Sequence, residues 1–253
     1  MNIVVFDTET TSLEKPFCYN IGYCIADIES GNVLVKKDFV VEQVWHNPML
    51  FTTAYYSDKR EIYVNRMKGR KCTMEKFGYI CQEMIRDFKA YNVELAFAYN
   101  SPFDVKVFEW NCEWFKCNNP FDNIPIKDIM NYVHTFIAFT KDFQNFCDKY
   151  EFYTESGNYS TSAETLFRYI DNNIDFEEEH TALADSLIEL SILRTCIIDF
   201  CADINGNYKR YSSIPRKVPR ELKVIDTNGN EHTFEYIKKR CYLDGNKIIL
   251  KKN

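Results

Sequence analysis

The chain has 253 residues, of which 45% are hydrophobic and 27% charged, which is ordinary for a globular protein and allows one large domain or one domain with a small module. No uninterrupted apolar run approaches the ~18 residues of a membrane-spanning helix, so we expect no membrane partner. The net charge of −6 is unevenly distributed, because residues 206–253 carry +7 and residues 1–205 carry −13.

The N-terminal residues and the cysteines both favour a cytoplasmic protein, in the host cytoplasm if the chain is viral. The first residues enter an apolar run directly, without the basic region and cleavage site of a secretion signal. The ten cysteines are scattered. Cys112-x4-Cys117 and Cys196-x4-Cys201 suggest zinc, but such a pair needs partner ligands, so we predict reduced and mostly buried thiols.

Hydrophobic periodicity predicts strands and helices that alternate along the first 200 residues. Strands are expected at 2–6, 19–28, 33–41, 93–98 and 124–129, and helices at 73–91, 102–115, 129–139, 142–150, 162–171 and 180–201. Thr73 is expected to cap the first helix, and Thr161 with Glu164 forms a capping box for the fifth. This order predicts an α/β fold with a mixed central sheet flanked by helices.

Two segments stand apart from this pattern. Residues 42–72 lack clear periodicity and are rich in aromatic and basic side chains, so they are either a nucleic-acid contact or a solvated loop. Residues 206–253 contain two hairpin signals, Asn228-Gly229 and Asp244-Gly245, after a linker marked by Pro215 and Pro219. We predict a domain at 1–205 and a basic β-hairpin module at 206–253, which either guides substrate or docks on protein, within this chain or in a partner.

Carboxylates and one histidine recur where the predicted elements begin or end. Asp7 and Glu9 follow the first apolar run two positions apart, so their side chains point to the same side. Asp104 falls in the first turn of a predicted helix, and His180 and Asp185 fall at the start of another. Acids at the edge of a core are costly unless they bind a metal, and each of these residues alone is more often an ordinary turn or surface residue.

Taken together, these segments resemble a known family. Asp7-Thr8-Glu9-Thr10-Thr11, Phe103-Asp104 and His180-x4-Asp185, in this order, are similar to the DEDDh exonucleases, which are DnaQ-like 3′→5′ enzymes with a ribonuclease H-like fold. The resemblance covers about residues 1–200 and includes residues 21–27, which look like the family's second strand. Tyr99-Asn100 replaces the more common His-Asn, and Ser12 stands where glycine is common.

The resemblance implies a two-metal phosphodiesterase. Asp7, Glu9, Asp104 and Asp185 would hold two divalent metal ions, Mg²⁺ or Mn²⁺, and His180 would be the general base. Thr10, Leu13, Asn100 and Phe103 match or adjoin positions that bind the 3′-terminal nucleotide. The implied partner is single-stranded nucleic acid or a 3′ end. Two alternatives remain open at this point: a nucleic-acid-binding subunit that does not cleave, and a phosphodiesterase of very short oligonucleotides.

Overall fold

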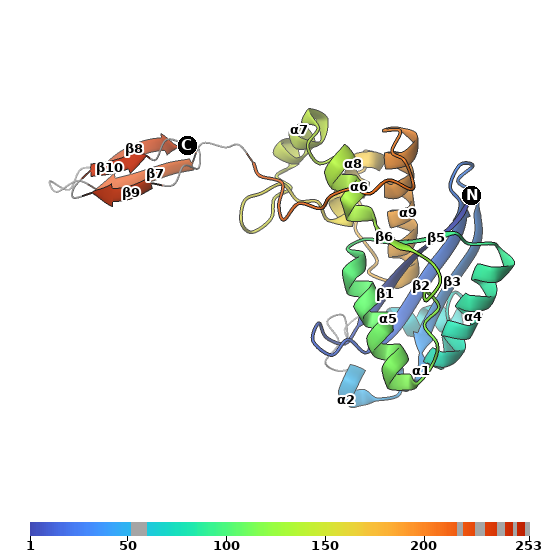
Figure 1. The fold of residues 1–253 in the computed structure, drawn as a ribbon. Coiled ribbons are helices and arrows are strands. Elements are labelled where there is room, and N and C mark those ends of the chain that lie inside the picture. Colours follow the sequence, from blue (N-terminus) through green and yellow to red (C-terminus); the bar gives the residue numbers. More distant parts are fainter. Residues whose placement is uncertain (52–59, 217–219, 226–230, 237–240, 245–246, 251–253) are drawn as a thin grey trace. The chain divides into compact units, whose positions relative to one another are not determined.

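The computed structural model describes residues 1–51, 60–216, 220–225, 231–236, 241–244 and 247–250, with side chains up to residue 216 except that of Phe51. Its centre is a six-stranded sheet in the order β4-β3-β2-β1-β5-β6 (Figure 1). The strands are β1 (Asn2–Thr10), β2 (Cys18–Asp27), β3 (Val33–Val41), β4 (Thr73–Glu75), β5 (Leu95–Ala98) and β6 (Ile126–Asp128). β1, β2 and β3 pair antiparallel, and the other three strands join in parallel.

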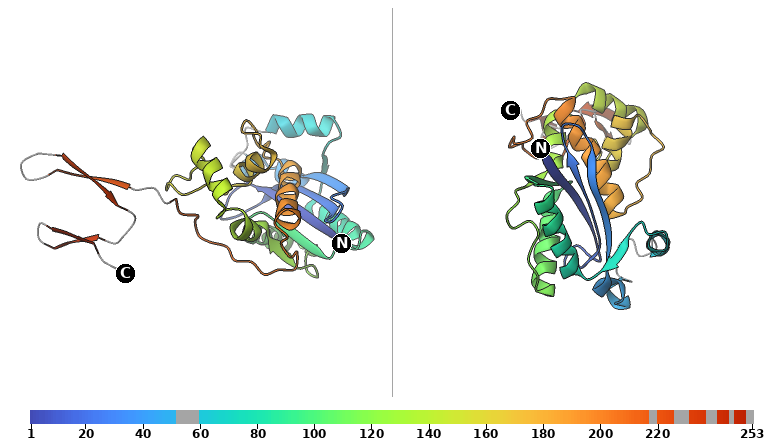
Figure 2. Two further views of the ribbon diagram at one scale, coloured as in Figure 1. Left: turned by 90° about the horizontal axis from the view of Figure 1, so that it is seen from above. Right: turned by 90° about the vertical axis from the view of Figure 1, so that its right-hand side faces the viewer.

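Helices cover both faces of the sheet, with α4 and α5 on one face and α9 on the other (Figures 1 and 2). The helices are α1 (Glu42–Trp45), α2 (Pro48–Phe51), α3 (Arg60–Lys68), α4 (Phe77–Ala90), α5 (Ser101–Phe115), α6 (Ile129–Phe136), α7 (Lys141–Tyr150), α8 (Ala163–Asp171) and α9 (Ala182–Ile198). The prediction of an α/β fold with a mixed central sheet flanked by helices is confirmed.

An aromatic cluster fills the space between the sheet and α4 and α5. Phe6 of β1 is fully buried and stacks on Phe121, with ring centroids 4.2 Å apart. Phe108 of α5 meets both rings edge to face, at 5.7 Å from Phe6 and 4.9 Å from Phe121. Such pairs add about 0.5–1.5 kcal/mol beyond the area they bury. The strand that carries Asp7 and Glu9 is therefore fixed from behind by a rigid core.

Among the predicted boundaries that differ from the structure, four are informative. β1 extends to Thr10 because it stays paired with β2, so Asp7 and Glu9 lie within the strand and not after it. Thr73 is not a helix cap, because Thr73–Glu75 pairs with β3 as a parallel strand and α4 begins at Phe77. The cap of α8 is Ser162, whose hydroxyl accepts from the amide of Thr165, and not Thr161. His180 is not in the first turn of α9, which begins two residues later.

The chain divides into two compact units. The first comprises Met1–Phe152 and Ser160–Ile214, and the second comprises Tyr153–Tyr159 and Pro215–Asn253. In the second unit β7 (Arg220–Ile225) pairs antiparallel with β8 (Glu231–Tyr236), and β9 (Cys241–Asp244) with β10 (Lys247–Leu250). The Asn228-Gly229 turn and Gly245 lie outside the described residues. Within the described ranges no helix combines the length and apolarity needed to cross a bilayer.

The last part of the first unit, residues 203–214, forms a strap along α6. The carbonyl of Ile204 accepts from the Tyr132 hydroxyl at 2.6 Å and from the Lys127 ammonium at 3.0 Å. Further along, the amide of Tyr211 donates to Nδ1 of His134 at 3.0 Å, and Ile214 is buried. This strap packs as part of the first unit, so a truncation near residue 205 would remove contacts of the body.

Candidate metal centre

The sheet places Asp7 and Glu9 side by side on β1, one of its inner strands. Side chains alternate along a strand, so two acids separated by one residue share a face. The register pairs Asp7 with Gly22 and Glu9 with Asn20 of β2. Glu9 is nearly buried, and its Oε2 lies 3.5 Å from the hydroxyl of the fully buried Tyr19. Both acids therefore sit at fixed positions on the α9 side of the sheet.

Helix α9 reaches these acids because Gly22 has no side chain. A Cβ at Gly22 would lie 2.0 Å from the amide nitrogen of Leu183, so the first turn of α9 rests directly on β2. Asp185 belongs to that turn. Carboxylate oxygens of Asp7, Glu9 and Asp185 all lie within 4.8 Å of one another. Three of the four predicted acids are thus brought together from β1 and α9, which are more than 170 residues apart.

Asp104 lies beside this group but outside it. It occupies the first turn of α5, which starts after Asn100 in a left-handed conformation and has Pro102 near its N-terminus. Its carboxylate is 2% exposed, and its Oδ1 accepts a hydrogen bond of 2.7 Å from the Thr8 hydroxyl. Thr8 stands between Asp7 and Glu9 on β1, so this bond ties α5 to the segment that carries the other acids.

The carboxylates strongly disfavour one another's charge. Burial raises the pKa of Asp7 from 3.8 to about 7. Burial, followed by the charge of Asp7, raises the pKa of Asp104 well above its ordinary value. A cluster of ionised acids whose pKa values are raised in this way is unfavourable unless a cation neutralises its charge. Oxygen ligands of this kind are those preferred by Mg²⁺ and Mn²⁺, so the residues present fit a hard divalent cation.

Glu189 is a further acid of this cluster that the sequence analysis missed. It lies one turn after Asp185 on α9 and is 3% exposed. Burial and then the charges of Asp7, Asp104 and Asp185 raise its pKa well above normal. Its Oε2 accepts from the amide of Tyr99 at 3.2 Å, which fixes the loop that leads to α5. In the sequence, the only signal that Glu189 lies near the other acids was its i, i+4 spacing from Asp185.

His180 stands just before α9 and is held by its neighbours. Its backbone has a φ of 48°, in the left-handed region. Its Nδ1 lies 3.6 Å from Oε2 of Glu178, and its side chain is 33% exposed. Its carbonyl accepts from the hydroxyl of Tyr63 at 3.4 Å. The imidazole is therefore accessible from solvent, on a backbone that is fixed from two sides.

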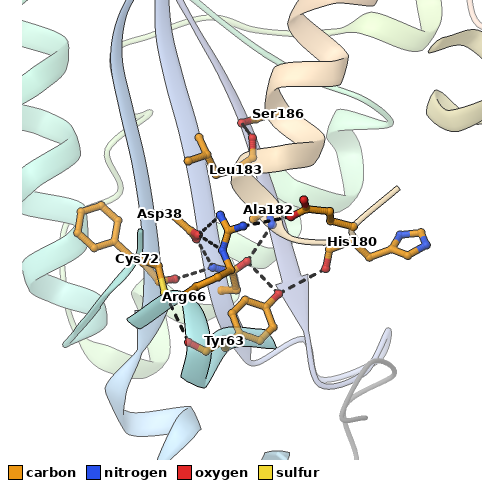
Figure 3. A network of polar contacts seen from close by, with 11 residues as sticks. Asp38, Tyr63, Arg66, Cys72, His180, Ala182, Leu183 and Ser186 are labelled. Carbon is orange, nitrogen blue, oxygen red and sulfur yellow. Dashed lines mark hydrogen bonds and ion pairs between the residues drawn. The ribbon is translucent and has the colours of Figure 1, made fainter. Parts of the chain in front are cut away.

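A buried polar network holds the start of α9 and the His180 segment in place (Figure 3). Its centre is Asn20, which is fully buried and uses both ends of its amide. Its Oδ1 accepts from the amide of Ala182 at 2.8 Å and from the Tyr63 hydroxyl at 3.1 Å. Its Nδ2 donates to Asp38 Oδ1 at 2.7 Å and to the carbonyl of Phe39 at 2.9 Å. Asn20 thus satisfies an end amide of α9 that has no partner within the helix.

Helix α3 closes this network from the segment 42–72. Arg66 donates from Nε and Nη2 to Oδ2 of Asp38, at 3.1 and 2.8 Å, and from Nη1 to Oε2 of Glu179 at 3.1 Å. Tyr63 is fully buried. Both side chains therefore make contacts within the protein, and nucleic-acid contact by this segment stays a prediction. Tyr55, Tyr56 and Lys59 of the same segment lie outside the described residues.

The four residues predicted to contact substrate occupy different environments. Leu13 is 74% exposed in the connection between β1 and β2, whereas Thr10 is buried and its hydroxyl donates to the Ser12 carbonyl at 3.3 Å. Phe103 packs partly buried against the core. Asn100 accepts from Arg210 of the strap through its side-chain oxygen. Leu13 is therefore the most accessible apolar side chain of the four.

One pocket among the described residues lies away from the acids. It has a volume of about 580 Å³ and lies between the strap and the start of α6, where its lining includes Lys127, Asp128 and Arg210. None of the clustered acids lines it.

Comparisons with known proteins identify the fold. Neither a family model nor a curated protein matches the chain. E. coli exonuclease I in complex with a dA16 oligonucleotide is 15% identical with a TM-score of 0.50, and the match covers 78% of this chain and 40% of that one. A complex described as ExoI/SSB-Ct is 14% identical with a TM-score of 0.50, covering 79% of this chain and 42% of that one.

A third solved structure is the nuclease domain of 3′hExo, described as a DEDDh family member bound to rAMP. It is 13% identical with a TM-score of 0.48, over 79% of this chain and 93% of that one. The chain spans about 40% of the length of exonuclease I, so the likeness is to part of that protein. At these identities the likeness is one of fold: the first unit shares an α/β nuclease fold with exonuclease I.

Proposed function

We propose that the first unit is a metal-dependent 3′→5′ exonuclease that hydrolyses phosphodiester bonds of nucleic acids from the 3′ end. The observation that carries this proposal is the convergence of Asp7, Glu9 and Asp185 within 4.8 Å, on a fold shared with exonuclease I. Buried acids without cations are unfavourable, so a cluster of this kind is best explained by the binding of divalent ions.

Four carboxylates are proposed as the ligands of two Mg²⁺ or Mn²⁺ ions. Glu9 and Asp185 would hold one ion and Asp104 the other, and Asp7 would serve both. When bound, such ions lower the pKa of water and neutralise the charge that develops on the phosphate. The hydrogen bond from the Thr8 hydroxyl ties Asp104 to β1, the strand that carries Asp7 and Glu9. It therefore fixes the position of Asp104 relative to these two acids.

His180 is proposed as the general base that takes the proton of the attacking water. Glu178 lies 3.6 Å from Nδ1 and would stabilise the imidazolium that forms when the ring takes up the proton. The base sits on a segment anchored by Tyr63 at its carbonyl and by Arg66 at the preceding Glu179. Anchoring of this kind limits the freedom of a catalytic group that is not itself in a helix.

The 3′-terminal nucleotide is proposed to lie against the β1–β2 connection and the start of α5. Leu13 offers an exposed apolar side chain for contact with a base, and Thr10 at the end of β1 and Phe103 in the first turn of α5 are proposed to contact the same nucleotide. Asn100, placed by Arg210, is proposed to contact the same nucleotide. A single strand suits this arrangement, because its end base is not held in a duplex.

The test is cleavage of a 5′-labelled single strand in saturating Mg²⁺ or Mn²⁺. The wild type should give a ladder that shortens by one nucleotide from the 3′ end. Asp7→Ala should reduce turnover by far more than the tenfold that corresponds to ~1.4 kcal/mol of barrier. The matched control is Asp171→Ala, which removes an exposed acid at the end of α8 and should leave turnover unchanged.

Three results contradict the proposal or narrow it. Turnover of Asp7→Ala above a tenth of wild type would contradict the metal assignment. Binding of the strand without any product would identify a non-cleaving subunit. Activity confined to di- to pentanucleotides would identify a phosphodiesterase of short oligonucleotides.

A further inference from the structure

Three cysteines from separate parts of the first unit meet on the face of the sheet that is opposite to α9. They are Cys81 of α4, Cys112 of α5 and Cys117, which follows α5. Their sulfur atoms all lie within 4.8 Å of one another, and Cys81 and Cys117 are 4.0 Å apart. None of the cysteines up to residue 216, where side chains are described, forms a disulfide. No residue of the acidic cluster is part of this group.

The fold brings the three thiols together by a specific turn of the chain. Lys116 ends α5 in the left-handed conformation, with a φ of 55°. The amide of Cys117 then donates to the carbonyl of Cys112 at 3.1 Å, which turns the chain back toward the helix. On the other side α4 packs against this turn at Gly78, where a Cβ would be in ordinary van der Waals contact with the Cβ of Cys117, at 3.5 Å.

The spacing of the sulfur atoms suits thiolate ligands around one ion. Zinc binds sulfur at about 2.3 Å in tetrahedral geometry, so its sulfur ligands lie about 3.8 Å apart. The 4.0 Å between Cys81 and Cys117 is close to that value, and far from the ~2.05 Å of a disulfide. Small movements of side chains would close the remaining gap.

A fourth ligand position is also available. A pocket of about 200 Å³ opens onto Cys81 and Cys117 and is lined by Gln82, Lys116 and Asn118. The carbonyl of Asn118 lies 3.8 Å from Sγ of Cys112. A water molecule entering through the pocket would complete four-coordination, and the ammonium of Lys116 would offset the net negative charge of three thiolates and one Zn²⁺.

The geometry points to a zinc site formed by Cys81, Cys112 and Cys117. Binding replaces three S–H bonds by three S–Zn bonds and releases three protons to solvent, without oxidation or reduction. The site joins α4 to the end of α5. Cys112 lies eight residues after Asp104, about 12 Å along the helix, so the ion would anchor the far end of the helix that carries a proposed ligand of the metal centre. Zinc binding by the three cysteines does not require that the chain be a nuclease.

The test uses the full chain reconstituted with Co²⁺, which absorbs by charge transfer when sulfur ligands bind it and not when only carboxylates do. The wild type should show this absorption with about one equivalent of ion, and Zn²⁺ should abolish it. Cys81→Ser and Cys117→Ser should weaken the binding of Zn²⁺ by at least about tenfold. The matched control is Cys147→Ser, which changes a fully buried thiol on α7. Absence of the band in the wild type, or equal bands in all variants, would overturn the site.

A second measurement needs no variant and therefore does not depend on whether serine variants fold. Native protein is alkylated with and without Zn²⁺, and the modified peptides are identified by mass spectrometry. Zn²⁺ should slow the alkylation of the half-buried Cys117 by at least about tenfold and leave that of the exposed Cys201 unchanged. Equal rates at Cys117 with and without Zn²⁺, or a disulfide between Cys81 and Cys117 in protein purified without reductant, would overturn the proposal.

Discussion

Replacing Gly22 by alanine should separate Asp185 from the acids of β1. The new Cβ would lie 2.0 Å from the amide nitrogen of Leu183, 2.2 Å from the carbonyl carbon of Ala182 and 2.4 Å from the Cα of Leu183. Ordinary contacts between such atoms are about 3.5 Å, so the first turn of α9 must recede by about 1.5 Å. The atoms that clash belong to the backbone, so no side-chain rotation relieves the overlap.

The displacement should lower both stability and turnover. Overpacking of this kind costs about 1–3 kcal/mol, and the hydrogen bond of 2.8 Å from Ala182 to Asn20 would also lengthen. For a unit of this size that cost lowers Tm by about 2–12 °C. Asp185 moves with the turn, and a misplacement of about 1 Å reduces turnover by about 10²-fold.

The assay compares Tm and cleavage of a labelled strand in saturating Mg²⁺ for Gly22→Ala and a matched variant, Gly78→Ala. Gly78 lies in α4, where the new Cβ would meet only the Cβ of Cys117, at an ordinary 3.5 Å. Alanine in a helix is favoured over glycine by about 0.5–1 kcal/mol, so the control should be at least as stable as wild type. Wild-type Tm and turnover in Gly22→Ala would refute the close contact between α9 and β2.

Three further outcomes follow from the site and from the charge distribution. The pKa of Asp7 is raised by burial from 3.8 to about 7, so the metal-free folded chain binds this proton more tightly than the unfolded chain. The free energy of unfolding of the metal-free chain should therefore fall as pH rises from about 4 to 7. Mg²⁺ should raise Tm more at pH 8 than at pH 5. A Tm shift by Mg²⁺ that is independent of pH would contradict this. His180→Ala should slow turnover by about 10²–10⁴ with little change in binding, and the variant should lose the rise in rate with pH near neutrality that the wild type shows; identical pH profiles would exclude His180 as the base. Ending the chain at Arg216, which keeps the strap, should weaken binding of long strands and flatten its salt dependence while sparing dinucleotide turnover. Equal loss on both substrates with a lower Tm would show that the basic residues 217–253 serve stability.

Local pattern was sufficient to predict five of the six strands of the central sheet. The strand expected at residues 33–41, after the hairpin signal Ser30-Gly31-Asn32, has the observed bounds of β3. Pattern failed at Thr73, where a polar residue before a helical periodicity looks like a cap. Pairing with β3 makes it a strand instead, and that pairing joins residues more than 30 positions apart.

The supporting shell of the site could not be predicted, because it depends on contacts between distant residues. Asn20 binds the amide of Ala182 across 162 positions, and nothing around Asn20 in the sequence marks it as the support of a helix. Cys81 is equally unmarked, because the other two thiols of its group lie on the next helix and the turn after it. Sequence motifs reveal residues that would bind the metal or the substrate. The residues that position these ligands are found only once the fold is known.

The left-handed backbone at His180 has a consequence for variants selected from libraries. A φ of 48° is unfavourable for a side chain such as histidine by about 1 kcal/mol, and glycine adopts it without cost. A library randomised at this position and sorted for resistance to proteolysis should therefore enrich glycine and asparagine, whereas the same library sorted for cleavage should retain histidine. The two sorting criteria would then select different residues at position 180. The difference in residue frequencies between the two pools would measure the stability that is lost by keeping histidine there.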